Sequence, residues 1–498
     1  MSTTAENKIK NIVTYLTPSM LGNILPIITL PIMTRFLLPE DFGIVALAAG
    51  FPTILVSFLS CNVHTGAERY FFEYHRDNKA LSRLINTTIT FLVLSFGAAL
   101  PVVFLLKNWF SLLILGSVDY GFALFLSYVS ACLGILSTFY MTLYRNMEKA
   151  GKFSFYMNMM MIINTGLGLL LVVGFRFGYI SLIYAPLGAG LIVFSLLFIS
   201  FQRDFPFSFD RKMLIDNLKY GIPLLPNLLT SAIYGLFDKY MLRSFVSLSS
   251  TGIYSLAQNI TTKLFVFMTA VQSTFHPIFM KDIFDRGKAA ASSVGRNFTI
   301  FTYISLTAVL GMILFGEELI YLLAPSSYSG AINVALILLC GIATQTFGKI
   351  IGLPLAYAKK AYLSFPVSIL GVILNVLLNI LLIPRWGAIG AGLTTTFTIV
   401  MMNYISHLIA QKYFRINYEV KILLFLYLNV FLSAFLLVYL RMTDAHFILK
   451  YSVKLASLLA FIMTGIHAKI ITRNTINIVL GLLRLNNKIP VKNEAVTK

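Results

Sequence analysis

Three lysines lie inside long apolar stretches of the sequence, where a charged side chain is costly. Lys263 sits near the middle of its stretch, and Lys454 lies near the end of another. Lys349 lies in one half of a third stretch. Ionisable residues at such positions usually face a cavity or a partner. No Asp or Glu is expected in the central part of any apolar stretch. Lysines without carboxylates suit an anion, such as a pyrophosphate or an acidic sugar, better than a cation.

The alternative for these lysines is that the long side chain carries its ammonium group to the membrane surface. This alternative suits Lys454 at the outer face and also applies to Lys349 at the inner face. Lys263 has the longest way to either surface, which favours a role in a cavity.

Two arginines near the ends of apolar stretches are further candidates. Arg35 ends the first stretch, and Arg69, in the segment AERY, follows the second. A guanidinium group binds phosphate through paired donors, so both residues are candidate contacts for a phosphorylated headgroup. The alternative is an ordinary interfacial anchor beside an acidic residue, Glu40 or Glu68.

The composition indicates that these residues are carried by membrane helices. The chain has 498 residues, of which 58% are hydrophobic and only 12% are charged. Its mean hydropathy is +0.82. The excess of 39 Lys and Arg over 19 Asp and Glu could suggest nucleic-acid binding. The polar background of such proteins is missing, however. Apolar runs of about 20 residues are long enough to cross a bilayer, and they predict an all-α polytopic membrane protein with about 14 spans.

The basic residues follow the loops on one side of the predicted membrane. If the amino terminus is placed in the cytoplasm, the cytoplasmic loops hold most of the Lys and Arg residues, as the positive-inside rule requires. Both termini are then cytoplasmic. The loops are short, and none of them is long enough for a soluble catalytic domain. Most of the net charge is therefore a signal of topology.

An internal repeat indicates how the spans are grouped. The segment starting at Gly43 (GIVALA) recurs at Gly252 (GIYSLA), and Gly178 aligns with Gly387, both 209 residues apart. Because six spans fit in this offset, the two copies have the same orientation. The predicted domains are two six-helix lobes and two extra helices, followed by a cytoplasmic tail. Their ranges are 1–208, 209–417, 418–475 and 476–498.

Several segments resemble the O-antigen and polysaccharide flippases of the multidrug/oligosaccharidyl-lipid/polysaccharide (MOP) exporter superfamily. The resemblance spans most of the chain. It rests on LPIMTRFLLPEDFGIVALA, LFDKYML, GIYSLA and NVLLNILLIPRWGAIGAGLTT, which begin at residues 30, 236, 252 and 375.

The resemblance implies a flippase and not an enzyme. Such proteins move undecaprenyl-pyrophosphate-linked oligosaccharides from the cytoplasmic to the outer leaflet of the bacterial plasma membrane by alternating access. The products serve O-antigen and lipopolysaccharide, capsule or exopolysaccharide biosynthesis. The implied partners are the lipid-linked oligosaccharide, membrane lipids, and the glycan polymerase and chain-length regulator of the same pathway, with no nucleic acid. No cofactor or metal is implied beyond a coupling ion, Na⁺ or H⁺.

The related peptidoglycan-precursor flippases imply a place for that ion. Their sodium site combines an Asp in the seventh span with two acidic or amide residues in the eleventh and a Thr in the twelfth. Asp238, Asn375, Asn379 and Thr394 match this pattern. Asn379 departs from it, because the pattern prefers a carboxylate there. The alternative is that Asp238 pairs with Lys239 or Arg243.

Two other functions compete with the flippase. A multidrug exporter of the same superfamily usually needs a membrane carboxylate for cation exchange, and none is evident from the sequence. A membrane glycan polymerase or ligase needs a catalytic surface on the outer side, for which the outer loops are short. The sequence also lacks a glycine-rich phosphate loop, a metal-ligand spacing and a nucleophile elbow.

Overall fold

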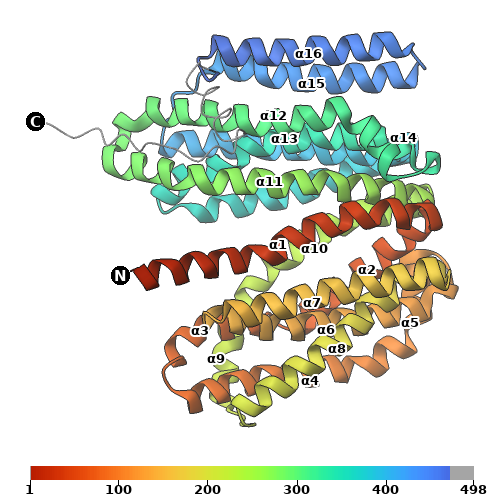
Figure 1. Cartoon of the computed structure of the whole chain (residues 1–498), viewed down its shortest axis with the longest axis vertical. Helices are drawn as coiled ribbons and strands as arrows, with labels where there is room; N and C mark the ends of the chain where they lie inside the picture. Colours follow the sequence, from red (N-terminus) through yellow and green to blue (C-terminus); the bar gives the residue numbers. More distant parts are fainter. Residues whose placement is uncertain (1, 472–498) are drawn as a thin grey trace, which may run out of the picture. The chain divides into compact units, whose positions relative to one another are not determined.

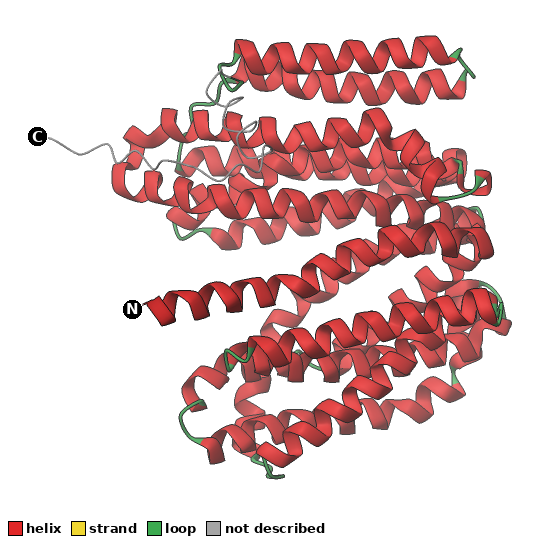
Figure 2. Ribbon diagram, in the orientation of Figure 1, coloured by secondary structure: helices red, strands yellow, loops and turns green. Residues whose placement is uncertain are grey.

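The computed structural model describes residues 2–471 of the chain. Within this range it also leaves undescribed the side chains of residues 2–13, 227, 229–234, 270, 349, 351 and 361. The described residues form helices joined by short loops and contain no strand (Figure 2). The all-α prediction is therefore confirmed.

Sixteen α-helices account for most of the described chain (Figure 1). Their bounds are α1 Ser2–Phe36, α2 Pro39–Leu59, α3 Val63–Tyr74, α4 Asn78–Leu105, α5 Lys107–Leu115, α6 Gly121–Asn146, α7 Ala150–Leu169, α8 Ser181–Asp204, α9 Arg211–Gly221, α10 Leu225–Phe245, α11 Leu248–Arg286, α12 Ala291–Leu323, α13 Gly330–Tyr357, α14 Ser364–Tyr413, α15 Val420–Met442 and α16 Phe447–His467.

The helices are long and apolar enough for a multi-pass membrane protein. Among the described residues, 11 helical segments meet the length and hydropathy of a membrane span. One of them, Leu248–Leu323, contains both α11 and α12. Another coincides with α14, whose backbone breaks at Gly387. A count of 14 spans stays a prediction.

Acidic side chains, which are scarce in this chain, start two of the helices. The carboxylate of Asp77 accepts hydrogen bonds from the backbone N–H groups of Lys79 and Ala80, at 2.9 and 3.3 Å. Asp210 does the same for Lys212 and Met213 at the start of α9, at 2.9 and 3.2 Å. Each cap satisfies N–H groups that have no partner within the helix and opposes the positive end of its dipole.

Two regions of the helical chain differ from the sequence prediction, the seventh span and the loop expected over 64–83. The seventh span, expected over 215–237, is divided by a 3-10 turn at Ile222–Leu224 and continues through α10 to Phe245. Pro223 and Pro226 lie at this division, because a proline removes an N–H donor and fits the first turn of a helix. In contrast, α1 continues through Pro18, Pro26 and Pro31. The expected loop over 64–83 holds α3.

The backbone carries the internal repeat that the sequence indicates. Gly178 and Gly387 both have positive φ angles, +63° and +55°, a region that glycine adopts readily. Gly43 and Gly252 lie at a close contact between the first turns of α2 and α11. A Cβ atom on Gly43 would lie 2.0 Å from the carbonyl oxygen of Leu248, and one on Gly252 would lie 1.7 Å from that of Pro39. Two equivalent positions of the repeat therefore meet each other.

The helices divide into two compact units that differ from the predicted lobes. The first unit comprises Met1–Lys263, Gly316–Leu338 and Ser364–Met402, and the second comprises Leu264–Phe315, Leu339–Leu363 and Asn403–Lys498. The predicted two-lobe domain ranges stay a prediction.

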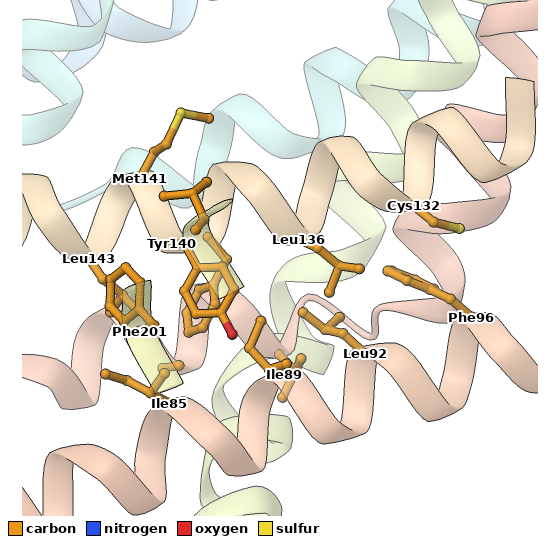
Figure 3. Close-up of a cluster of buried hydrophobic side chains, with 14 of the residues drawn as sticks. Ile85, Ile89, Leu92, Phe96, Cys132, Leu136, Tyr140, Met141, Leu143 and Phe201 are labelled. Carbon is orange, nitrogen blue, oxygen red and sulfur yellow. The ribbon is translucent and has the colours of Figure 1, made fainter. Parts of the chain in front are cut away.

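Each unit has its own apolar core. In the first unit, Ile89 and Phe96 of α4 face Leu136 and Tyr140 of α6, with Phe201 of α8 beside them (Figure 3). In the second unit, the core of α11, α12 and α13 includes Phe279, Phe298, Phe301 and Ile350. The helices α15 and α16 pack against each other as a pair (Figure 1).

Candidate functional site

A buried carboxylate lies at the centre of a polar cluster in the first unit. Asp238 is 2% exposed and lies well inside α10. Its Oδ1 accepts a hydrogen bond from Nδ2 of Asn379 at 2.6 Å. Its Oδ2 accepts hydrogen bonds from the hydroxyl groups of Tyr254 and Thr395, both at 2.7 Å. Three donors thus compensate a charge that would otherwise be costly to bury.

The side chains of this cluster come from three helices. Asp238 lies on α10 and Tyr254 on α11, while Asn375, Asn379 and Thr395 lie on α14. Asn375 and Asn379 share one helix face because they are four residues apart. The break at Gly387 separates these two residues from Thr395, so α14 contributes from both of its segments.

Two buried polar atoms of the cluster have no hydrogen-bond partner among the described residues. They are Nδ2 of Asn375 and Oδ1 of Asn379, and Oγ1 of Thr394, next to Thr395 in the sequence, also has none. Most buried polar groups are satisfied, so unpartnered amide atoms beside a carboxylate require an explanation. A ligand that contacts the oxygen atoms of the cluster provides one.

The donor set fits a hard monovalent cation. Nδ2 of Asn379 donates both to Asp238 and, at 3.1 Å, to Oδ1 of Asn375. The two ends of an amide are assigned from the hydrogen-bond network, and half a turn of the Asn379 amide would bring its oxygen to the same place. Oxygens of Asp238, Asn375 and Asn379 would then converge, and hard cations bind oxygen ligands. With a single carboxylate, the cluster is better matched to one positive charge than to two.

Three of the four residues that the resemblance assigns to a cation site lie in this cluster. The structure brings Asp238, Asn375 and Asn379 together, and Thr394 is buried one residue away from the contact. The threonine that touches the carboxylate is the next one, Thr395.

The alternative role of Asp238, an ion pair with a basic residue of the same helix, is not found in the structure. Neither Lys239 nor Arg243 forms an ion pair with Asp238, and Arg243 donates to the carbonyl oxygen of Leu112 at 3.0 Å. Asp238 lies inside α10, which ends eight residues beyond the predicted end of the seventh span at residue 237. The expectation that no Asp or Glu lies in the central part of a span stays a prediction, because α10 is not among the segments of the described chain that meet the length and hydropathy of a span.

The two predicted arginines lie outside this cluster. Arg69 is exposed and forms an ion pair with Glu73, one helical turn away on α3. It does not pair with Glu68, the acid that the sequence suggests. Its guanidinium carbon also lies 4.7 Å from the ring centroid of Tyr70. Arg35 is exposed at the end of α1 and forms no ion pair within the described chain.

The three intramembrane lysines have different surroundings. Lys263 is exposed on α11 and makes no hydrogen bond or ion pair with the residues that the structure describes. Lys454 of α16 is buried, at 6% exposed, and its ammonium lies 4.9 Å from the ring centroid of Tyr451. The side chain of Lys349 lies outside the described residues. An anion-binding role for Lys263 and Lys349 stays a prediction.

Comparison with known proteins identifies the family. Residues 9–282 match the family model described as "Polysaccharide biosynthesis protein". The chain belongs to this family. The chain is also similar to the probable low-salt glycan biosynthesis flippase Agl15 of Haloferax volcanii, with 26% identity over 246 residues. That match covers 47% of this chain and 50% of Agl15, so the chain spans about half the length of this relative.

Two solved structures share the fold of this chain. A lipid II flippase MurJ in an inward closed conformation superposes with a TM-score of 0.69 and 13% identity, covering 93% of this chain and 99% of MurJ. An inward-facing multidrug resistance MATE family transporter of the MOP superfamily superposes with a TM-score of 0.62 and 16% identity, covering 81% and 97%. The family match confirms the resemblance to polysaccharide biosynthesis proteins, and the likenesses to MurJ and the MATE transporter show a shared fold. The substrate is not fixed by these likenesses.

Proposed function

We propose that this polysaccharide biosynthesis protein is a flippase that translocates a polyprenyl-pyrophosphate-linked oligosaccharide from the cytoplasmic to the outer leaflet. The match over residues 9–282 to a polysaccharide biosynthesis family carries the proposal. The similarity to a probable glycan flippase and the fold shared with MurJ support it. The finer proposal is an undecaprenyl carrier in a bacterial plasma membrane, with both termini in the cytoplasm and O-antigen, capsule or exopolysaccharide as the product.

The energetics of such a step favour outward movement of an anion. A membrane potential that is negative inside contributes about 2.3 kcal/mol per charge per 100 mV. A diphosphate headgroup that crosses the full field with two negative charges gains about twice this amount. Basic side chains such as Lys263 and Lys349 would hold that headgroup, while the polyprenyl tail stays in the lipid.

The Asp238 cluster supports cation coupling of this transport. Asp238, Asn375 and Asn379 would hold the ion, with Thr394 or Thr395 as a further oxygen ligand. A bound cation supplies a positive charge that neutralises the carboxylate. The same residues join α10 and α11 to both segments of α14, so the protein's own hydrogen bonds link the site to three helices.

Deletion of the gene in its native host tests the proposed function. Single lipid-linked repeat units are expected to accumulate on the inner leaflet. Accumulation on the outer leaflet would instead indicate a polymerase and would overturn the proposal. Complementation with Lys263→Ala and Lys349→Ala then tests the headgroup contacts, and full activity of both variants would remove the anion-binding role.

One observation favours a second candidate function. Asp238 supplies the buried membrane carboxylate that a cation-coupled multidrug exporter usually needs, and the MATE transporter shares the fold. Efflux of ethidium from cells that express the protein, with loss in Asp238→Asn, would support this candidate. Absence of efflux in cells that still export glycan would exclude it.

A further inference from the structure

A second polar site lies in the first unit, away from the Asp238 cluster. It is a half-open pocket of about 210 Å³ between α2, α3 and α6. The pocket is lined by Thr53, Val56, His64, Glu68, Ala131, Gly134, Ile135, Thr138 and Phe139. Thr53 and Thr138 are exposed and mark the open side. Water occupies about 30 Å³ per molecule in the liquid, so the pocket has room for several waters.

Two titratable side chains share one face of α3 in this pocket. His64 and Glu68 are four residues apart and therefore neighbours on the helix surface. Nδ1 of His64 is buried and has no hydrogen-bond partner among the described residues. Glu68 forms no ion pair within the described chain, because the adjacent Arg69 pairs with Glu73 on the exposed side. A histidine and a carboxyl group thus share a pocket whose other lining residues are apolar except for Thr53 and Thr138.

The surroundings of the pair favour its neutral forms. Burial lowers the pKa of His64 to about 4, so the imidazole is uncharged at neutral pH. Burial raises the pKa of the Glu68 carboxyl group, and the positive charge of Arg145 offsets part of this effect. Desolvation disfavours a charged carboxylate, which keeps the proton on Glu68 to a higher pH than usual.

The other charged groups of the packed elements leave this balance unchanged. Arg145, at the end of α6, is the charged group that offsets part of the rise in the pKa of Glu68, whereas burial accounts for the lowered pKa of His64. The remaining titratable groups on the helices packed against α3 are Tyr128, Cys132, Tyr140 and Tyr144 of α6, Lys79 and Arg83 of α4, and Arg211, Lys212, Asp216, Lys219 and Tyr220 of α9. None of them lines the pocket.

We propose that His64 and Glu68 form a proton-binding site, in which Glu68 carries the exchangeable proton and His64 positions it. In the binding step, an O–H bond of hydronium in the pocket breaks and an O–H bond forms on the Glu68 carboxylate, whose charge rises from −1 to zero. Neutral His64 accepts a hydrogen bond from the resulting carboxyl group or from a water between them. The assignment of this proton to transport rests on the proposed flippase function.

Infrared pH titration of the full-length protein in nanodiscs tests proton binding directly. The wild type is expected to keep a protonated carboxyl band above the ordinary pH range of glutamate. Glu68→Gln should remove that band, and His64→Gln should shift its midpoint. Glu73→Gln, on the same helix but exposed, is the matched control and should leave the band unchanged. A wild-type titration within the ordinary range, or a band that persists in Glu68→Gln, would overturn the proposal.

A transport measurement in vesicles distinguishes a failure of this inference from a failure of the proposed function. In vesicles, an imposed pH gradient is expected to accelerate flipping by the wild type and by Glu73→Gln, with loss of this acceleration in Glu68→Gln. Flipping that is equally sensitive to the gradient in Glu68→Gln would refute the coupling and leave the flippase function standing. A wild type that titrates as expected but moves no lipid-linked oligosaccharide would refute the flippase and leave the proton site standing.

Discussion

The contact between Gly43 and Gly252 offers a sharp test of how the repeated helices pack. Both glycines lie in the first turn or two of a helix, α2 or α11, and each backbone fills the space beside the other. A Cβ atom in Gly252→Ala would lie 1.7 Å from the carbonyl oxygen of Pro39, whereas ordinary contact begins near 3.4 Å. The two backbones must therefore move apart by about 1.7 Å. Backbone atoms cannot swing away as the end of a flexible side chain can.

The expected cost follows from overpacking. Extra atoms in a well-packed region typically cost about 1–3 kcal/mol. Alanine also favours a helix over glycine by roughly 0.5–1 kcal/mol, which offsets part of that cost. Gly97 provides a matched control because it lies inside α4 and a Cβ atom there would meet nothing within 4 Å. The free energy of unfolding should therefore be lower for Gly252→Ala than for Gly97→Ala, and this difference isolates the overpacking cost of about 1–3 kcal/mol.

Thermal unfolding of purified variants in the same detergent measures this difference. Gly252→Ala should unfold several degrees below the wild type, while Gly97→Ala should match or exceed it. The unfolding temperature of the double variant Gly43→Ala/Gly252→Ala should fall by less than the sum of the decreases in the two single variants. One separation of the two helices relieves both clashes. Equal unfolding temperatures for Gly252→Ala and Gly97→Ala would refute the close contact.

Three further predictions concern single side chains. Asp238→Asn should abolish any thermal stabilisation by NaCl over choline chloride, because the cluster loses its only charge; stabilisation that survives in the variant would place the cation elsewhere. Asn379→Asp should bring that stabilisation to lower Na⁺ concentrations, since a second carboxylate then faces the ion; an unchanged half-saturating concentration would contradict the assigned ligand. Tyr328→Phe should cost about 1–3 kcal/mol in unfolding, because the buried hydroxyl donates to the carbonyl oxygen of Leu37 at 2.7 Å. Exposed Tyr439→Phe is the control for this loss, and equal stability of the two variants would contradict the prediction.

Features that repeat along the chain could be predicted from the sequence. The long apolar runs predict helices throughout, and the paired motifs at Gly43 and Gly252 mark positions that meet in the structure. Gly178 and Gly387 likewise share a positive φ angle. These signals are local or internal to the sequence, so they need no knowledge of tertiary contacts.

Features that depend on long-range packing could not be predicted. From the sequence, Tyr254 in GIYSLA is expected to be an aromatic residue of the apolar core. Its hydroxyl group reaches Asp238 because α10 and α11 approach each other. Thr394 and Thr395 are adjacent, so sequence spacing cannot say which one faces the carboxylate. The sequence does not mark His64 as a candidate, because the pocket that it shares with Glu68 is completed by α6, which is distant in sequence from α2 and α3.

Flipping by the purified protein in proteoliposomes tests the central claim most directly. A fluorescent undecaprenyl-pyrophosphate-linked oligosaccharide is placed in one leaflet, and its appearance in the other is followed with an impermeant quencher or a lectin. The account predicts transfer well above that of protein-free vesicles, with a loss in Asp238→Asn under cation-dependent conditions. Transfer by the wild type no faster than in protein-free vesicles, across cation and pH gradients of both directions, would contradict it.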